Sequence, residues 1–88
     1  MNEKELEKVL KAIANRRRVQ ILKYLKKAKR SSVGNMAAET RLSFQATSRH
    51  LSILYSVNIL DKRQESLVVW YFLAKNMNPV VKKLLSVI

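Results

Sequence analysis

The 88-residue chain contains no cysteine, one histidine, one glycine, one proline and only six acidic residues. Without cysteine, disulfide bonds, thiolate metal sites and thiol redox sensing are excluded. The single histidine, His50, cannot form an ordinary metal site by itself. One glycine and one proline leave little room for long flexible loops. We therefore expect regular secondary structure over most of the chain.

Long hydrophobic runs are also missing. No stretch approaches the roughly 18 uninterrupted apolar residues of a membrane span. The first residues, MNEKELEKVLK, are too charged for a signal peptide, so we expect a soluble cytoplasmic protein. A chain of this length forms one small domain, residues 1–88, which buries only about 60 to 65% of its unfolded surface. This limited burial favours a partner subunit.

The scarcity of acidic residues leaves a strong positive charge, since 18 lysines and arginines against six acidic residues give a formal net charge of +12. Nucleic acid is the natural partner of such a chain, and a membrane surface is a weaker candidate. Eleven of the cations lie in the first 30 residues. On DNA, most of them would act on phosphates and leave specificity to a few side chains elsewhere. For the cations between Lys26 and Arg30, the alternative to binding phosphate is that they form a solvated helix face.

Apolar spacing predicts five helices, near residues 3–14, 16–28, 35–40, 44–57 and 78–88. The expected N-caps are Asn15, Ser43 and Asn78, the last followed by Pro79. Val33 is expected as a short strand residue before the third helix. Because two short helices joined by a tight turn at 41–42 are the skeleton of a helix-turn-helix, we expect that motif here.

After Asn58 the period changes, and two strands are predicted at Ile59–Gln64 and Leu67–Leu73. The second strand, LVVWYFL, is rich in β-branched and aromatic residues. Trp70, Tyr71 and Phe72 are expected as core and sheet residues rather than as a stacking platform, and because alternation would bury only some of these rings, Tyr71 can be exposed. A hairpin directly after a helix-turn-helix is a wing. The predicted fold is therefore mainly α (α+β), a winged helix-turn-helix of about five helices with a two-stranded β-hairpin wing.

The fourth helix divides into two chemically opposite faces when it is wound at about 100° per residue. The polar arc consists of Gln45, Ser48, Arg49, Ser52 and Ser56. The opposite arc consists of Thr47, His50, Leu51, Leu54 and Val57. An amide, hydroxyls and a guanidinium are the groups that read base edges and phosphates in the major groove of DNA. This helix is therefore the predicted reading helix.

Three segments resemble the ArsR/SmtB-type winged-helix transcriptional regulators, in the family's order and spacing. LKAIANRRRVQILKYL (10–25) resembles the first two helices, and VGNMAAETRLSFQATSRHLSIL (33–54) resembles the helix-turn-helix with its specific tetrapeptide SRHL. LDKRQESLVVWYFL (60–73) resembles the wing. Metal-sensing members carry a cysteine box before the turn, or His and acidic ligands on the terminal helices. This chain has neither, so we expect no metal regulation and no cofactor.

The resemblance implies a homodimer formed by the first and last helices, near residues 3–14 and 78–88. The apolar side chains expected at that interface are Leu6, Leu10, Val81, Leu84, Leu85 and Ile88. They would leave an apolar surface too large for so small a monomer. The alternative is that the last helix only closes the core of the monomer.

The expected base contacts are Phe44, Gln45, Ser48 and Arg49. The expected contacts to the DNA backbone are Arg16, Arg17, Arg18, Ser43, Ser52, Lys62 and Arg63. The alternative for Gln45 is that it serves only as an exposed helix former, and the alternative for Phe44 is that it packs under the turn. For the wing cations, the alternative is that they are solvated charges on the hairpin. His50 is expected to pack inward with a hydrogen bond to neighbouring backbone, rather than to act as a pH or metal switch.

These features predict a dimeric, sequence-specific regulator of transcription, a repressor that occludes a promoter. One alternative is an architectural protein that coats DNA without sequence preference, and another is a winged helix that binds an acidic protein. An enzyme is not expected, because the sequence offers no nucleophile and base pair, no glycine-rich phosphate loop and no metal cluster. The operator and any small-molecule effector are not specified by the sequence.

Overall fold

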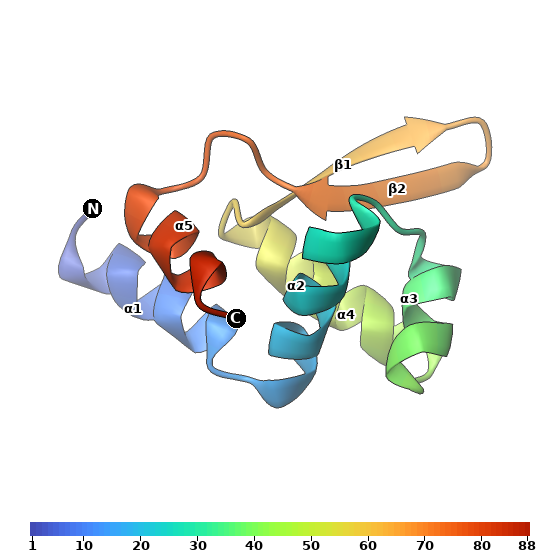
Figure 1. The fold of residues 1–88 in the computed structure, drawn as a ribbon, viewed down its shortest axis with the longest axis horizontal. Helices are drawn as coiled ribbons and strands as arrows, with labels where there is room; N and C mark the ends of the chain where they lie inside the picture. The colour runs from blue at the N-terminus through green and yellow to red at the C-terminus, as the bar shows by residue number, and fades with distance from the viewer.

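The computed structural model describes all 88 residues and contains five helices and one two-stranded antiparallel sheet (Figure 1). The elements follow in the order α1 (Glu3–Ile13), α2 (Arg16–Ala28), α3 (Val33–Thr40), α4 (Phe44–Ser56), β1 (Leu60–Glu65), β2 (Val68–Leu73) and α5 (Pro79–Ser86). The predicted winged helix-turn-helix fold is confirmed, with α3 and α4 as the helix-turn-helix and β1 and β2 as the wing. None of the helices is long and apolar enough to span a membrane.

Each helix begins after a residue whose side chain accepts a hydrogen bond from a backbone N–H of the first turn. These N-caps are Asn2, Asn15, Ser32, Ser43 and Asn78. The three caps predicted from the sequence are confirmed. Each such cap contributes about 1 kcal/mol to stability, because it satisfies a donor that the helix itself cannot pair.

The start of α3 differs from the prediction. The hydroxyl of Ser32 accepts from the N–H of Asn35 at 3.1 Å, so the helix begins at Val33. The prediction of a strand residue at Val33 is therefore wrong. The strand-like residue is Ser31, whose N–H and carbonyl pair with the carbonyl and N–H of Tyr71 at 3.0 and 2.8 Å.

The wing is a hairpin whose register runs from Leu60 opposite Leu73 to Glu65 opposite Val68, with residues 66 and 67 at its tip. Tyr71 is only 6% exposed, which confirms it as a core residue and shows that the alternative of an exposed ring is wrong. Its strand is covered on the outer edge by the pairing with Ser31. Its side chain shares a face with that of Leu60, which points into the core.

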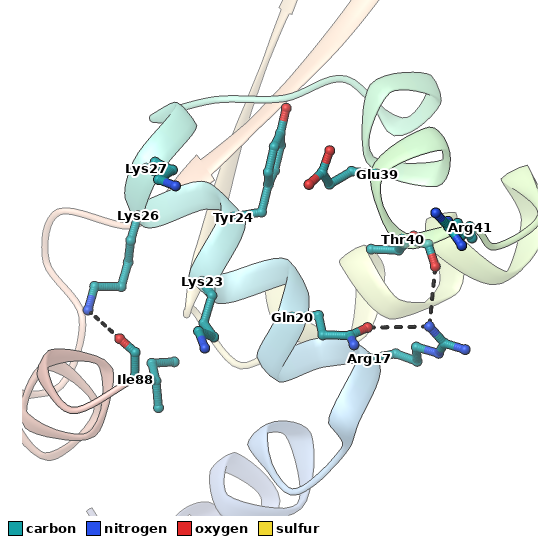
Figure 2. A pocket seen from close by; sticks show the side chains of 10 residues that line it. All are labelled: Arg17, Gln20, Lys23, Tyr24, Lys26, Lys27, Glu39, Thr40, Arg41 and Ile88. Atoms are coloured by element: carbon teal, nitrogen blue, oxygen red, sulfur yellow. Dashed lines mark hydrogen bonds between the residues drawn. The ribbon is translucent and has the colours of Figure 1, made fainter.

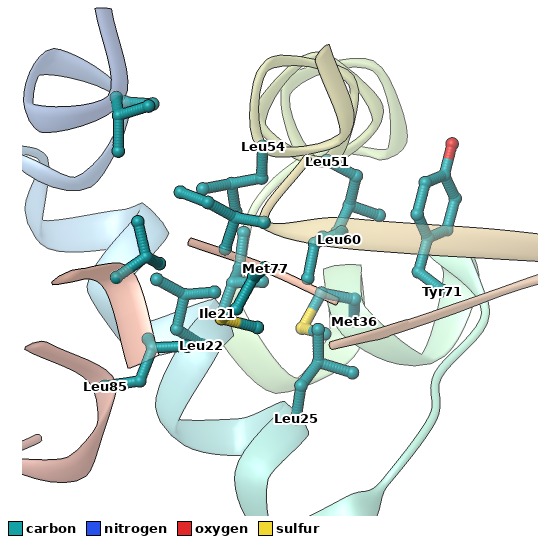
Figure 3. Packing of buried hydrophobic residues seen from close by; sticks show 14 residues of the cluster. Ile21, Leu22, Leu25, Met36, Leu51, Leu54, Leu60, Tyr71, Met77 and Leu85 are labelled. Atoms are coloured by element: carbon teal, nitrogen blue, oxygen red, sulfur yellow. The ribbon is translucent and has the colours of Figure 1, made fainter. Parts of the chain in front are cut away.

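One cluster of 14 buried side chains forms the core (Figure 3). Its members are Val9, Ala12, Ile21, Leu22, Leu25, Met36, Leu51, Leu54, Ile59, Leu60, Tyr71, Met77, Val81 and Leu85. Each fully buried leucine or isoleucine contributes about 1.5 to 3 kcal/mol relative to an exposed one. Every helix and both strands supply at least one of these side chains. The strands supply them only near the base of the wing, so the tip of the wing extends beyond the core.

Helices α2 and α4 bury facing sides against this core, namely Ile21, Leu22 and Leu25 on α2 and Leu51 and Leu54 on α4. Their exposed sides therefore point in opposite directions. Figure 1 shows α2 in front of α4 along the shortest axis of the molecule. Helices α1 and α5 lie at the end opposite the tip of the wing.

Candidate nucleic-acid interface

Helix α4 has the two faces that the sequence predicts. Gln45, Arg49 and Ser52 are exposed, and Ser48 is half-buried. The core-facing side is buried and consists of Thr47, Leu51 and Leu54. The arrangement leaves an amide, a guanidinium and a hydroxyl free on one side of a firmly packed helix, which is what base readout requires.

The turn before α4 fixes where that helix begins. Arg41 adopts the left-handed conformation, with φ of 58°, and ends α3 by donating its N–H to the carbonyl of Ala37. The hydroxyl of Ser43 then accepts from the N–H of Ala46 at 3.1 Å, which starts the next helix. Phe44, the first residue of α4, is 59% exposed. It is therefore not packed under the turn, and its contact with a thymine methyl group stays a prediction.

The half-buried side chain of Arg18 is held by contacts with the neighbouring helices α1 and α4. Its Nε donates to the carbonyl of Ala12 at 2.6 Å, and one terminal nitrogen lies 3.4 Å from the carbonyl of Lys11. These carbonyls belong to the last turn of α1, where the carbonyl groups of a helix find no hydrogen-bond donor within the helix itself. The other terminal nitrogen lies 3.1 Å from Nδ1 of His50. The side chain thus joins α1, α2 and α4.

His50 is half-buried and points inward as predicted, but its partner is the Arg18 side chain rather than backbone. Since a guanidinium carries only donors, Nδ1 of His50 must be the acceptor and the imidazole must be neutral. Burial lowers the pKa of His50 below its ordinary value of 6.5, and the charges of Arg18, Arg17 and Arg49 lower the pKa further. Protonation would abolish the acceptor and add a positive charge among three guanidinium groups.

The other two arginines of the run differ from Arg18. Arg17 donates to the carbonyl of Thr40 at 3.2 Å and lies 3.4 Å from Oε1 of Gln20, so it fastens the end of α3 to α2. Arg16 is exposed at the start of α2. The structure thus places the three adjacent arginines in three surroundings, which their sequence alone does not distinguish.

Lys62 and Arg63 lie on opposite faces of the wing, because successive side chains of a strand alternate. The ammonium of Lys62 stands 4.5 Å above the ring of Tyr55 in α4, on the side of the reading helix. Arg63 pairs in register with Trp70 on the other face. The two cations therefore cannot make the same contact with DNA, and their binding to phosphate stays a prediction.

Comparison with known proteins decides the family. The family model described as "Bacterial regulatory protein, arsR family" matches residues 15–62, more than half of the chain. The chain belongs to the ArsR family. It is 38% identical over 81 residues to the transcriptional activator HlyU of Vibrio cholerae serotype O1, covering 84% of this chain and 74% of that protein.

Solved structures of ArsR-family proteins share the fold. Reduced HlyU from Vibrio cholerae N16961 superposes with a TM-score of 0.81 at 34% identity, over 98% of this chain and 86% of that one. The homodimeric winged helix-turn-helix domain Mb0332 from Mycobacterium bovis superposes with a TM-score of 0.81 at 28% identity, over 96% of this chain and 74% of that one. This ArsR-family protein is accordingly a DNA-binding regulator of transcription, and its relatives are regulators rather than enzymes.

The residues expected at the family's dimer interface fall into two groups. Leu6 and Leu10 of α1 are 36% and 44% exposed, whereas Val81 and Leu85 of α5 are buried in the monomer core. Val81 and Leu85 therefore do not form part of an apolar surface, which corrects that expectation. Leu84 and Ile88 are half-buried. The last helix thus closes the monomer core with one face, whether or not another face meets a partner subunit.

Three residues near the interface were not predicted from the sequence. Tyr55 lies under Lys62, and Leu67 at the tip of the wing is 95% exposed. The guanidinium of Arg30 stacks 4.1 Å from the centre of the Trp70 ring and lies 3.2 Å from a carboxylate oxygen of Glu65, which ties the wing to the end of α2. The partners of Arg30 are separated from it by some 35 residues or more, so no periodicity indicates them.

Metal ligands are not clustered in this fold. The structure brings together no group of three or more His, Cys, Asp or Glu side chains.

Proposed function

We propose that this ArsR-family protein is a sequence-specific, dimeric regulator that inserts α4 into the major groove of an operator. Gln45, Ser48 and Arg49 contact base edges, and Phe44 contacts a thymine methyl group at the first turn. The observation that carries the proposal is the polar, exposed side of α4 beside its fully buried apolar side. Residues at the N-terminal end of a reading helix are the ones that reach base edges in helix-turn-helix complexes.

Phosphate contacts come from around the helix, since α4 contributes only one cation, Arg49. Ser43 and Ser52 bind the backbone beside the groove, and Lys62 does so from the wing. Arg63 and Arg16 are longer-range candidates, because each is exposed. We assign Arg18 a structural role instead, since its donors are occupied by Ala12, Lys11 and His50.

The dimer forms through the end of the molecule opposite the tip of the wing. Leu6 and Leu10 present exposed apolar side chains there and line an apolar patch on α1. Leu84 and Ile88 are half-buried and are the remaining candidates for the interface. The homodimeric state of the Mb0332 domain supports the formation of a dimer. A symmetric dimer would place two copies of α4 in successive major grooves, about 34 Å apart.

We propose repression by occlusion, in the cytoplasm where the chromosome lies, without metal or other cofactor. Occlusion needs only a bound protein, whereas activation also needs a contact with the transcription machinery. The relative HlyU is named as an activator, so a reporter with the operator moved upstream of the promoter distinguishes the two. If the protein activates transcription from the upstream position, the mechanism is activation and not repression by occlusion. Added zinc leaves DNA affinity unchanged in this account.

Selection of bound sequences from random DNA, followed by footprinting, tests the proposal. We expect a protected dyad with half-sites about 10 base pairs apart. Uniform protection of every duplex would instead support an architectural protein. Failure to bind any duplex at about 100 mM salt would support a module that binds an acidic protein, since phosphate-driven affinity falls steeply with salt.

A further inference from the structure

A basic cleft of about 710 Å³ lies between α2 and the end of α3 (Figure 2). We call it the α2–α3 cleft. The residues that line it include Arg17, Lys23, Tyr24, Lys27, Thr40 and Arg41. Its volume falls within the range of about 300 to 1,000 Å³ that is typical of small-molecule sites. Its lysines belong to the exposed side of α2, which points away from the exposed side of α4.

The cleft carries an unbalanced positive charge. Five cations line it, and Glu39 is its one acidic side chain. The ammonium of Lys26 donates to the carbonyls of Leu85 and Ile88 at 2.7 and 3.0 Å, which hold it in place without neutralising its charge. The ion pairs of the chain join Lys11 to Glu7 and Arg30 to Glu65, so neither neutralises a cation of the cleft. Five cations therefore stand around one acidic side chain in a concave surface.

Two of these cations repel each other, and Arg17 is also held in place. Lys23 and Lys27 stand one turn apart on α2, a spacing at which like charges destabilise a helix. Arg17 is held by the side chain of Gln20 and by the carbonyl of Thr40, and its remaining N–H groups have no partner in the protein. Figure 2 shows Lys23 between Arg17 and Lys26 along α2. A bound anion would relieve the repulsion and meet donors already in position.

We propose that the α2–α3 cleft binds a small polyanion that carries two or more phosphate groups. Duplex DNA held by α4 does not reach Lys23 and Lys27, because these lysines lie on the exposed side of α2, which faces away from the exposed side of α4. The site adjoins the Thr40–Arg41 turn that leads into α4, through the hydrogen bond of Arg17 to Thr40. It is therefore placed to act as an effector site, and only this regulatory consequence rests on the proposed function.

The first experiment uses the free protein with inorganic tripolyphosphate as the probe, at constant ionic strength. Amide chemical shifts should move chiefly around Arg17, Lys23, Lys27 and Arg41. The variant Lys23→Gln with Lys27→Gln should bind about tenfold or more weakly. The matched control is Lys4→Gln with Lys8→Gln, two exposed lysines at the same spacing on α1, and it should bind within about twofold of wild type. Equal losses in both variants, or shifts spread over every basic surface, would overturn the site.

The second experiment adds a saturating duplex. We expect tripolyphosphate to bind the duplex-bound protein with the same shifted residues. Displacement of tripolyphosphate by duplex, together with a smaller salt slope of DNA binding in the Lys23→Gln, Lys27→Gln variant, would assign the cleft to the DNA backbone and overturn the proposal. If the proposed function fails and no duplex binds, the first experiment still decides whether the cleft binds the anion.

Discussion

The guanidinium of Arg18 in α2 lies 3.1 Å from Nδ1 of His50 in α4, while its Nε donates to the carbonyl of Ala12 at the end of α1. One side chain thus satisfies the end of one helix and orients another. Because His50 lies one residue after Arg49, this contact also sets how the reading side of α4 is presented.

Replacing Arg18 by alanine should lower the free energy of unfolding by about 1.5 to 3 kcal/mol, since hydrogen bonds from a charged donor are lost and a carbonyl of α1 is left unpaired. Urea unfolding measures the change. Arg16→Ala, which removes an exposed arginine of the same helix, should cost less than about 0.5 kcal/mol. Comparable losses in the two variants would contradict the structural role of Arg18.

The stability of the protein should fall as the pH drops through the range just below the ordinary pKa of His50. Burial and three arginines lower the pKa of His50 in the folded state. Between that value and the unfolded value near 6.5, the unfolded chain holds a proton that the folded protein does not. The contribution of neutral His50 is therefore complete above about pH 6.5 and is lost below it.

Urea unfolding of wild type and His50→Gln between about pH 7.5 and about pH 5.5 measures this effect. Glutamine offers an oxygen to Arg18 but does not titrate. The free energies of unfolding of the two proteins should therefore converge, or cross, as the pH falls. Parallel curves over this range would show that His50 does not titrate differently in the two states.

The sequence predicts those parts of the molecule that depend on local periodicity and capping. The two faces of α4 and the caps Asn15, Ser43 and Asn78 all follow from residues within one or two turns of each other. Element boundaries are less well predicted, since the strand residue is Ser31 rather than Val33. Ser31 pairs with Tyr71, forty positions away, and no local pattern reports such a contact.

Long-range contacts also explain why the site residues were predicted only in part. The adjacent arginines 16–18 look alike in sequence, yet Arg18 is held by His50 and Arg17 by Thr40. The apolar residues of α5 recur at helical spacing, which does not tell whether a given face meets the monomer core or a partner. Burial separates them: Val81 and Leu85 close the core.

Leu10→Glu should produce a monomer that keeps its fold, because Leu10 is exposed at the proposed dimer surface and a buried carboxylate there would be unpaired. Sedimentation measures the oligomeric state, and circular dichroism the fold. Leu67→Glu, a matched change at the tip of the wing, should remain dimeric. Leu85→Ala should act differently and cost about 2 to 5 kcal/mol of monomer stability. A dimeric Leu10→Glu protein would place the interface elsewhere.

Lys62→Ala should weaken binding to every duplex alike, since a phosphate contact carries no sequence information. The slope of log affinity against log salt concentration should become less steep by about 0.9. Fluorescence anisotropy at several salt concentrations measures both. Lys8→Ala removes an equal charge from α1 and should leave the slope nearly unchanged. A loss confined to the operator would make Lys62 a base-reading residue instead.

The central claim is that α4 reads sequence through Arg49, and the most direct test compares Arg49→Ala with wild type on the selected operator and on random duplex at the same salt concentration. We expect a loss of about 1 to 3 kcal/mol on the operator, roughly 5- to 150-fold, and a much smaller loss on random duplex. Equal losses on the two duplexes would contradict the reading role of α4.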